Sequence, residues 1–295
     1  MGFLEEVDNL IDVDVKKDQL MKKHTTIGVG GRADYFITVN SLFSLKNTIL
    51  LAKKYRVKYK VIGAGSNLLV SDDGFRGLIL KLNLKDVYLT EKGVRAMAGA
   101  RLNDLVDFCS SHGFSGCEKL YGIPASIGGA VVMNAGAFGS NIGDYVDFVE
   151  VLSGDRIKRI SAFDCGFKYR TSKFKSLKTP IVAVNFNFDL VAGASSRLAK
   201  ETLVKRLESF PKGKTFGSVF KNPKGDFAGK IIESCGLKGK RIGGAIVSDK
   251  HANFIINDQS ASAFDVDTLI KTVKETVKNK TGITLIEEVE RVGVF

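Results

Sequence analysis

The chain has 295 residues, 44% of them hydrophobic, so it is long enough for two domains with ordinary cores. Lysine and arginine outnumber aspartate and glutamate by 44 to 32, and the formal charge of +12 favours partners that carry negative charge. The four cysteines form no CxxC pair and have no metal-ligand spacing with the three histidines, so we expect buried thiols, a reducing compartment and no bound metal. The N-terminal residues lack the apolar core of a secretory signal, so we expect a cytoplasmic protein.

The first helix is expected in residues 41–56, where Ser41 is suited to cap the N-terminus. Apolar residues recur at helical spacing and should form the inner face: Leu42, Leu45, Ile49 and Ala52. A second amphipathic helix is expected in residues 101–113, with Gly113 at its end. Its inner face should consist of Leu102, Leu105, Val106 and Cys109.

Between these helices lies "VIGAGSNLLVSDDGFRGLIL", residues 61–80. Two β-branched residues lead into Gly63-Ala64-Gly65-Ser66-Asn67, which is typical of a strand that enters a phosphate-binding turn. A dinucleotide-binding fingerprint requires a glycine at position 68 and then a helix, whereas Leu68 is followed here by a second turn. The stretch therefore predicts strand, turn, turn, strand, and a phosphate would be bound by backbone N–H groups alone. The alternative is a tight turn without a ligand.

Residues 120–140 carry no charge and are long enough to span a bilayer. They include Pro124 and five glycines, which favour buried backbone, so we expect no transmembrane segment. The repeated small residues of "GIPASIGGAVVMNAGAFG" suit a long, flat ligand that lies along the backbone, where larger side chains would keep it away.

Short β-rich runs are expected at residues 77–82, 94–98, 146–152, 157–160 and 181–190. Strands and helices do not alternate strictly, which indicates an α+β fold. A domain boundary is expected within "DLVAGASSRLAKE", which divides the chain into residues 1–192, with subdomains of about 1–82 and 83–192, and residues 193–295.

Beyond this boundary, a helix should begin at a capping Asp226 and end at Gly236, and another should begin at a capping Asp265 and end at Gly282. The inner face of the second should consist of Leu269, Ile270, Val273 and Val277. With residues 251–257 as a strand, this part predicts a compact α/β domain.

Six motifs, in order from about Thr25 to Gly293, resemble the UDP-N-acetylenolpyruvoylglucosamine reductase (MurB) family: "IGAGSNLLVSDDGFRGLIL", "GIPASIGGAVVMNAGAFG", "YRTSKFK", "GSVFKNP", "GKIIESCGLKGKRIGGAIVSDKHANFIIN" and "EEVERVG". The resemblance implies an FAD-binding fold of the vanillyl-alcohol-oxidase (PCMH) type in residues 1–192. It implies an α/β substrate domain in residues 193–295, whose C-terminal end returns to the active site. The stretch between Arg170 and Ser218 is too short for the tyrosine-bearing insertion of longer members, so the chain resembles the shorter subclass.

The resemblance implies that NADPH reduces UDP-N-acetylglucosamine enolpyruvate to UDP-N-acetylmuramate, a peptidoglycan precursor, through bound FAD. We further expect a monomer that binds no membrane, and no nucleic acid either, because the basic residues are scattered in short groups and no RNA-binding signature appears. The residues expected to bind FAD are Gly63, Ala64, Gly65, Ser66, Asn67, Leu68, Ile123, Pro124, Ser126, Gly128, Gly129 and Asn134. The basic charge would then meet the diphosphates of FAD, NADPH and the UDP-sugar.

Three residues match the catalytic positions of the family: Arg170 polarises the substrate carboxylate, Ser218 donates a proton, and Glu288 acts with Arg170 at the enolpyruvyl end. Glu288 is selected because it lies five residues before Gly293, and the neighbouring Glu287 and Glu290 are then expected to be solvated. Tyr169 and Asn222 match positions that contact the substrate. Taken alone, an arginine at a strand end or a Gly-Ser turn is usually only structural.

Two functions other than that of a reductase are compatible with some features of the sequence. A sugar or alcohol oxidase of the same fold often attaches its flavin through a histidine, but His24, His112 and His251 all lie outside the FAD-loop motifs. A basic nucleotide- or nucleic-acid-binding protein would bind no chromophore and would show salt-sensitive affinity for nucleic acid.

Overall fold

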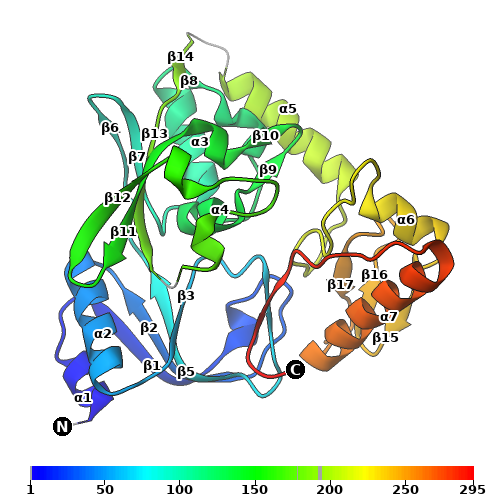
Figure 1. Ribbon diagram of the computed structural model, residues 1–295, viewed down its shortest axis with the longest axis horizontal. Helices are drawn as coiled ribbons and strands as arrows, with labels where there is room; N and C mark the ends of the chain where they lie inside the picture. Colours follow the sequence, from blue (N-terminus) through cyan, green and yellow to red (C-terminus); the bar gives the residue numbers. More distant parts are fainter. Residues whose placement is uncertain (1, 178, 192–194) are drawn as a thin grey trace. The chain divides into compact units, whose positions relative to one another are not determined.

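The structure is a computed structural model, which describes residues 2–177, 179–191 and 195–295 (Figure 1). The chain forms two compact units. Unit 1 consists of Met1–Lys16, Phe36–Ala64 and Leu78–Arg206, and unit 2 of Lys17–Tyr35, Gly65–Gly77 and Leu207–Phe295. The expected boundary between residues 192 and 193 lies outside the described residues.

Unit 1 contains a five-stranded antiparallel sheet in the order β12-β11-β13-β7-β6. Its strands are β6 (Val87–Thr90), β7 (Gly93–Met97), β11 (Val146–Ser153), β12 (Arg156–Ser161) and β13 (Ile181–Phe186). Every residue of the central strand β13 is buried, which suits its run of β-branched and apolar residues. Two helices, α3 (Leu102–Ser111) and α4 (Ile127–Met133), contact this sheet (Figure 1). The predicted inner face of α3 is confirmed.

The N-terminal part of unit 1 contains α1 (Phe3–Asp8), α2 (Leu42–Lys54) and β3 (Tyr59–Ile62). The Ser41 side chain caps α2 as predicted, but Leu42, at the first helical position, is exposed. A four-stranded sheet has the order β1-β2-β5-β3, with β1 (Val13–Leu20), β2 (Arg32–Val39) and β5 (Phe75–Leu82). The predicted order strand, turn, turn, strand in residues 61–80 is confirmed by β3, β4 (Leu68–Val70) and β5.

The other elements of the first 210 residues are short, except for one long helix. They are the strands β8 (Phe114–Ser115), β9 (Gly136–Ala137), β10 (Ser140–Asn141) and β14 (Asp189–Leu190), the helix α5 (Ser195–Ser209), and the 3₁₀ turns η1 (Met21–Lys23), η2 (Cys117–Leu120), η3 (Ile142–Tyr145), η4 (Phe163–Cys165) and η5 (Lys173–Lys175). The strand predicted at 181–190 is therefore interrupted after Phe186. All four cysteines are unpaired and buried, as predicted.

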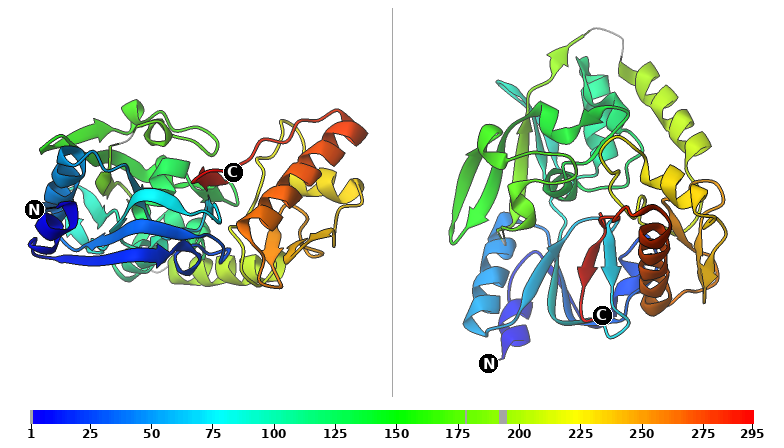
Figure 2. Two further views of the ribbon diagram at one scale, coloured as in Figure 1. Left: turned by 90° about the horizontal axis from the view of Figure 1, so that it is seen from below. Right: turned by 45° about the vertical axis from the view of Figure 1, so that its right-hand side comes forward.

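Unit 2 is built on a three-stranded antiparallel sheet, β15 (Arg241–Ile242), β16 (Ala245–Val247) and β17 (Ile255–Asn257), with the helices α6 (Ala228–Ser234) and α7 (Ala263–Thr281). Helix α7 lies along this sheet in both views of Figure 2, and its predicted inner face is buried. Strand β18 (Glu290–Val292) pairs in parallel with β4 (Figure 2, right).

Two predicted helix caps in unit 2 are wrong. The N-cap of α6 is Phe227, because the helix begins one residue later than Asp226 would require. The N-cap of α7 is Ser262, whose hydroxyl accepts the N–H of Asp265 at 3.0 Å. Asp265 instead occupies the third helical position and accepts the N–H of Ser262 at 3.0 Å, which completes a capping box.

Candidate active site

The turn between β3 and β4 requires glycine at position 65. Gly65 has φ +71°, and a Cβ atom at this position would lie 1.9 Å from the carbonyl oxygen of His24. The carbonyl of Gly65 accepts the N–H of Thr26 at 3.2 Å. Residues 24–26 therefore pack directly against the turn, and there is no space for a side chain at position 65.

Two backbone N–H groups of this turn are available as hydrogen-bond donors. Within residues 2–177, 179–191 and 195–295, the N–H groups of Gly65 and Ser66 donate to no backbone or side-chain acceptor. Unsatisfied N–H groups in a glycine-containing turn are suited to oxygen atoms of a phosphate. The turn therefore has donors of the kind that a pyrophosphate requires, and its contact with FAD stays a prediction.

The two segments predicted to bind the cofactor meet within unit 1. A Cβ atom at Gly63 would lie 2.0 Å from the Oγ atom of Ser126, so only glycine permits this contact. The segment that contains Ser126 is held by the start of α3, because the N–H of Leu102 donates to the carbonyl of Ala125 at 2.9 Å. Gly63 and Ser126 thus lie together, although more than sixty residues separate them in the sequence.

The paired glycines at the start of α4 have different surroundings. A Cβ atom at Gly128 would lie 3.1 Å from the Cβ of Ala98, so this glycine permits close packing against the residue that follows β7. At Gly129 the nearest atom to such a Cβ, the Oγ of Ser126 at 3.3 Å, belongs to the helix cap itself. The absence of a side chain at Gly129 leaves the backbone there accessible to a flat ligand.

Asn134 ends α4 in the left-handed conformation, with φ +45°. Its side chain is 5% exposed, and both ends of its amide are engaged. The Nδ2 group donates to the carbonyl of Lys168 at 3.0 Å, and Oδ1 accepts the N–H of Gly143 at 3.0 Å. In this structure Asn134 joins the end of α4 to the segment that carries Tyr169 and Arg170, and its contact with the cofactor stays a prediction.

Tyr169 and Arg170 form the tip of a tight turn in unit 1. Lys168 and Thr171 exchange two backbone hydrogen bonds across the turn, of 3.0 and 3.1 Å. Arg170 has φ +53°, a conformation that is strained for a residue with a side chain. Its guanidinium donates to the carbonyl of Gly136 at 2.7 Å and lies 5.0 Å from the centre of the Tyr169 ring. The strained turn thus directs Arg170 toward the residues that follow α4.

Sequence reasoning assigned no role to Ser172, although it belongs to the same motif. Its hydroxyl is buried and donates to the carbonyl of Val132 in α4 at 2.8 Å. Together with the contacts of Asn134 and Arg170, this bond attaches the "YRTS" turn to α4. Its place two residues after the predicted catalytic Arg170 was the only signal in the sequence, and it did not reveal the contact with Val132.

Ser218 and Glu288 lie on neighbouring segments of unit 2. Two isolated antiparallel bridges join Ser218 to Phe254 and Phe220 to Glu287. The N–H of Glu288 donates to the carbonyl of Val219 at 2.8 Å. The structure therefore brings together two of the predicted catalytic residues, which are distant in the sequence.

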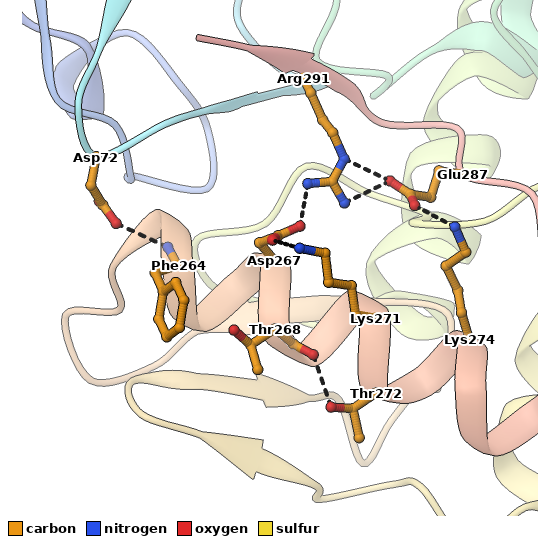
Figure 3. A network of polar contacts seen from close by, with 9 residues as sticks. All are labelled: Asp72, Phe264, Asp267, Thr268, Lys271, Thr272, Lys274, Glu287 and Arg291. Carbon is orange, nitrogen blue, oxygen red and sulfur yellow. Dashed lines mark hydrogen bonds and ion pairs between the residues drawn. The ribbon is translucent and has the colours of Figure 1, made fainter. Parts of the chain in front are cut away.

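Glu287 is not solvated, contrary to the expectation from the sequence. Its carboxylate accepts hydrogen bonds from Lys274 at 2.7 Å and from the Nε of Arg291 at 3.1 Å (Figure 3). Arg291 also contacts the buried carboxylate of Asp267, which is paired with Lys271 at 2.7 Å. Burial by itself would raise the pKa of Asp267, but hydrogen bonds from Lys271 and Arg291 outweigh it and hold that pKa below its usual value. This charged cluster fixes the segment beside Glu288 on α7.

Asn222, the predicted substrate contact in unit 2, has an exposed side chain whose Oδ1 accepts the N–H of Ala228 at 3.0 Å. It thereby satisfies one of the open N–H groups at the start of α6. Contact with a substrate stays a prediction for Asn222 and for Tyr169, which is half exposed in unit 1.

Comparisons with known proteins extend over nearly the whole chain. Residues 33–156 match the model of an FAD binding domain, and residues 208–292 match the C-terminal domain of UDP-N-acetylenolpyruvoylglucosamine reductase. The UDP-N-acetylenolpyruvoylglucosamine reductase of Carboxydothermus hydrogenoformans is 42% identical, over 98% of this chain and 97% of its own length. The reductase 1 of Bacillus thuringiensis subsp. konkukian is 39% identical, over 97% and 98%.

This chain belongs to the UDP-N-acetylenolpyruvoylglucosamine reductase (MurB) family. The crystal structure of the MurB of Thermus caldophilus superimposes with a TM-score of 0.81 and 34% identity, over 95% of this chain and 99% of that one. The expected fold class, an α+β FAD-binding fold of the vanillyl-alcohol-oxidase type with a C-terminal α/β domain, is confirmed.

The two domain models that match the chain cover different parts of the candidate site. The FAD-binding match includes residues 63–68 and 123–134, and the C-terminal match includes Ser218, Asn222 and Glu288, while Tyr169 and Arg170 lie between the two. Within the described residues, no helix is long and apolar enough to cross a membrane.

Proposed function

We propose that this protein is the NADPH-dependent FAD enzyme that reduces UDP-N-acetylglucosamine enolpyruvate to UDP-N-acetylmuramate, a step of peptidoglycan precursor synthesis. It is an oxidoreductase of the MurB family, with FAD as its cofactor and NADPH as its electron donor. The observation that carries the proposal is the arrangement in unit 2, where the segments of Ser218 and Glu288 are paired and Asn67 of the glycine-rich turn contacts Glu288.

The bound cofactor is proposed to be held by the turn at residues 63–68 and by the segment 123–134. When bound, FAD accepts a hydride from NADPH and passes it to the double bond of the enolpyruvyl ether. The N–H groups of Gly65 and Ser66 are available for the pyrophosphate, and Gly129 leaves room for a flat ring. The remaining tasks of the protein are to hold the substrate, to stabilise negative charge and to deliver one proton.

Arg170 is proposed to bind the carboxylate of the enolpyruvyl group. Addition of hydride to one carbon of the double bond places negative charge on the neighbouring carbon and on the carboxylate attached to it. A planar guanidinium binds a carboxylate through two parallel hydrogen bonds and stabilises this charge. The turn at residues 168–171 and the bond to Gly136 restrict where the guanidinium can lie.

Ser218 is proposed to donate the proton that completes the reduction. A hydroxyl is a weak acid, so it can protonate the substrate only because the carbon has become strongly basic after hydride addition. Glu288 is proposed to act beside Ser218 at the same end of the substrate, together with Arg170. The paired segments 218–221 and 286–288 are a rigid support for such a pair.

Several finer features follow as proposals. Residues 1–192 are inferred to form the FAD-binding domain and residues 193–295 the substrate domain, since the family matches at 33–156 and 208–292 lie within these ranges. The protein is inferred to act as a cytoplasmic monomer, because NADPH and nucleotide sugars are available there. Its charge of +12 is inferred to serve diphosphate ligands, not nucleic acid or a membrane surface.

The function is tested by incubating the FAD-loaded protein with NADPH and UDP-N-acetylglucosamine enolpyruvate in heavy water, with mass spectrometry of the product. We expect NADPH consumption that depends on the enolpyruvyl sugar, and a product with one solvent deuterium on the carbon beside the carboxylate. UDP-N-acetylglucosamine, which lacks the enolpyruvyl group, is the control and should not accelerate NADPH consumption. Equal consumption with both sugars, driven by oxygen alone, would indicate a flavin oxidase instead.

A further inference from the structure

Asn67, at the end of the glycine-rich turn, contacts the segment that carries Glu288. Its Nδ2 group donates to the carbonyl of Glu288 at 3.0 Å, and its own carbonyl accepts the N–H of Glu290 at 2.9 Å. The parallel pairing of β4 with β18 begins at the next residue, where Leu68 lies opposite Glu290. The side chain of Asn67 therefore extends this pairing by one hydrogen bond toward Glu288.

Both backbone groups of Glu288 are fixed, by two different parts of unit 2. Its N–H donates to the carbonyl of Val219 at 2.8 Å, and its carbonyl accepts from Asn67. A residue held on both sides has little freedom in φ and ψ, so its side chain leaves the backbone in one direction. Without Asn67, the bond from Glu288 to Val219 remains, but the hydrogen bond from the Asn67 amide to the carbonyl of Glu288 is lost.

The direction matters because two glutamates are adjacent. In an extended segment, neighbouring side chains point to opposite sides. Lys274 of α7 and Arg291 of β18 bind the carboxylate of Glu287 (Figure 3). The alternation then places the side chain of Glu288 on the other side of the segment. A slip of one residue would exchange the two carboxylates. Asn67 opposes such a slip, because its amide and carbonyl bind Glu288 and Glu290 at fixed spacing.

Asparagine has the chemistry that this position requires. The group opposite its side chain is a carbonyl, which accepts only, so the side chain must donate. The amide of asparagine donates without carrying charge, whereas an ionised aspartate of the same shape could not donate at all. Aspartate at position 67 would place two acceptors against each other, which is worse than the loss of the bond.

We propose that Asn67 is a positioning residue for Glu288, which joins the FAD-binding turn to the catalytic carboxylate. This inference rests on the proposed role of Glu288 in substrate reduction. It gives Asn67 a task beyond the cofactor contact expected from the sequence. Its side chain acts on the half-reaction in which the substrate is reduced, through Glu288, and not on the half-reaction in which NADPH reduces the flavin.

The test uses the FAD-loaded protein and measures the two half-reactions separately under anaerobic conditions. Asn67→Ala and Asn67→Asp are compared with Ser66→Ala, the neighbouring change in the same turn. For Asn67→Ala loaded with FAD we expect flavin reoxidation by the enolpyruvyl sugar to slow by about tenfold to hundredfold more than flavin reduction by NADPH does. Reoxidation of Asn67→Asp should be slower still. Any effect of Ser66→Ala should be a change in FAD affinity.

A double-mutant cycle with Glu288→Gln decides whether Asn67 acts through Glu288. We expect Asn67→Ala to cause little further loss of reoxidation rate once Glu288 is changed, whereas Ser66→Ala should show the same effect in either background. Independent, multiplying effects of Asn67→Ala and Glu288→Gln would overturn the inference. The inference would also be overturned if both Asn67 variants bound FAD more weakly but the FAD-loaded variants were reoxidised at the wild-type rate. If the wild-type flavin is not reoxidised by the sugar, the proposed function fails, and not the inference alone.

Discussion

The backbone N–H of Glu288 donates a 2.8 Å hydrogen bond to the carbonyl of Val219, the residue that follows Ser218. A proposed proton donor and a proposed catalytic carboxylate are therefore carried by directly paired backbone segments of unit 2. Neither segment can shift along the other without breaking this bond and the bridge between Phe220 and Glu287. This backbone pairing keeps the two proposed catalytic residues in register.

Ser218→Ala should affect only one half of the reaction. The proton is required when the substrate is reduced, so flavin reduction by NADPH should proceed at nearly the wild-type rate. Reoxidation by the enolpyruvyl sugar should slow by about 10²- to 10⁴-fold, the usual contribution of a positioned acid. Anaerobic stopped-flow absorbance of the flavin measures both rates in one protein. Equal losses in both half-reactions would contradict the role of Ser218.

Arg170→Lys should be nearly as harmful as Arg170→Ala for substrate reduction. Lysine keeps the positive charge but lacks the planar pair of donors, so stabilisation of the developing carboxylate charge is lost. We expect kcat/KM for the enolpyruvyl sugar to fall by about 10²- to 10³-fold. FAD content should be unchanged in both variants. A lysine variant with wild-type kcat/KM would show that charge alone is sufficient.

Gly65→Ala should weaken FAD binding by more than the strain of an alanine with positive φ alone would cause. The new Cβ would lie 1.9 Å from the carbonyl oxygen of His24, so the turn and its free N–H groups must move. Gly236→Ala is a matched control, because Gly236 has φ +72° and no atom within 4 Å of such a Cβ. Both variants should be destabilised, the control by about 1 kcal/mol. Only Gly65→Ala should lose FAD affinity, measured by flavin fluorescence during titration.

Asp267→Asn should destabilise the protein in a manner that depends on pH. The pKa of Asp267 is lower in the folded chain than in the unfolded chain, so its charged form stabilises the fold above the unfolded value of about 4. This contribution is lost as the pH falls through the lower, folded pKa. At pH 7 the variant leaves Arg291 and Lys271 without their carboxylate, which should cost about 1–3 kcal/mol of unfolding free energy.

Thermal unfolding at a series of pH values measures this dependence. The difference in melting temperature between wild type and Asp267→Asn should be largest near neutral pH and should narrow as the pH is lowered from about 5 toward 3. Asp155→Asn, a change at an exposed turn residue of unit 1, serves as the control and should show no such trend. A difference that is constant over this range would show that the charge of Asp267 does not stabilise unit 2.

The sequence allowed prediction of those features that depend on near neighbours. The strand and turn order of residues 61–80 could be predicted because glycine and β-branched residues impose local conformations. The inner faces of α3 and α7 could be predicted from helical spacing. The cap of α7 could not, because Ser262 and Asp265 are both able to accept a hydrogen bond there. The cap of α6 could not, because the helix begins after Phe227, which has no capping side chain.

The long-range contacts of the site could not be predicted at all. Asp72 lies in the second predicted turn of residues 61–80, and its carboxylate accepts the N–H of Phe264 at the start of α7 at 2.9 Å (Figure 3). It also accepts the N–H of Ala263 at 2.9 Å. Glu287 was expected to be solvated because nothing in "IEEVER" indicates the pairing with Lys274 and Arg291. Such partners are decided by the tertiary fold, and sequence spacing does not report them.

The central claim is tested most directly by the visible absorption spectrum of the purified protein in one anaerobic cuvette, recorded as isolated, after NADPH, and after UDP-N-acetylglucosamine enolpyruvate. We predict a yellow protein that is bleached by NADPH and recovers its colour when the enolpyruvyl sugar is added. Bleaching without recovery would keep the flavoprotein and contradict the substrate. A colourless protein that cannot be reconstituted with FAD would contradict the role of Gly63–Asn67 and the function built on it.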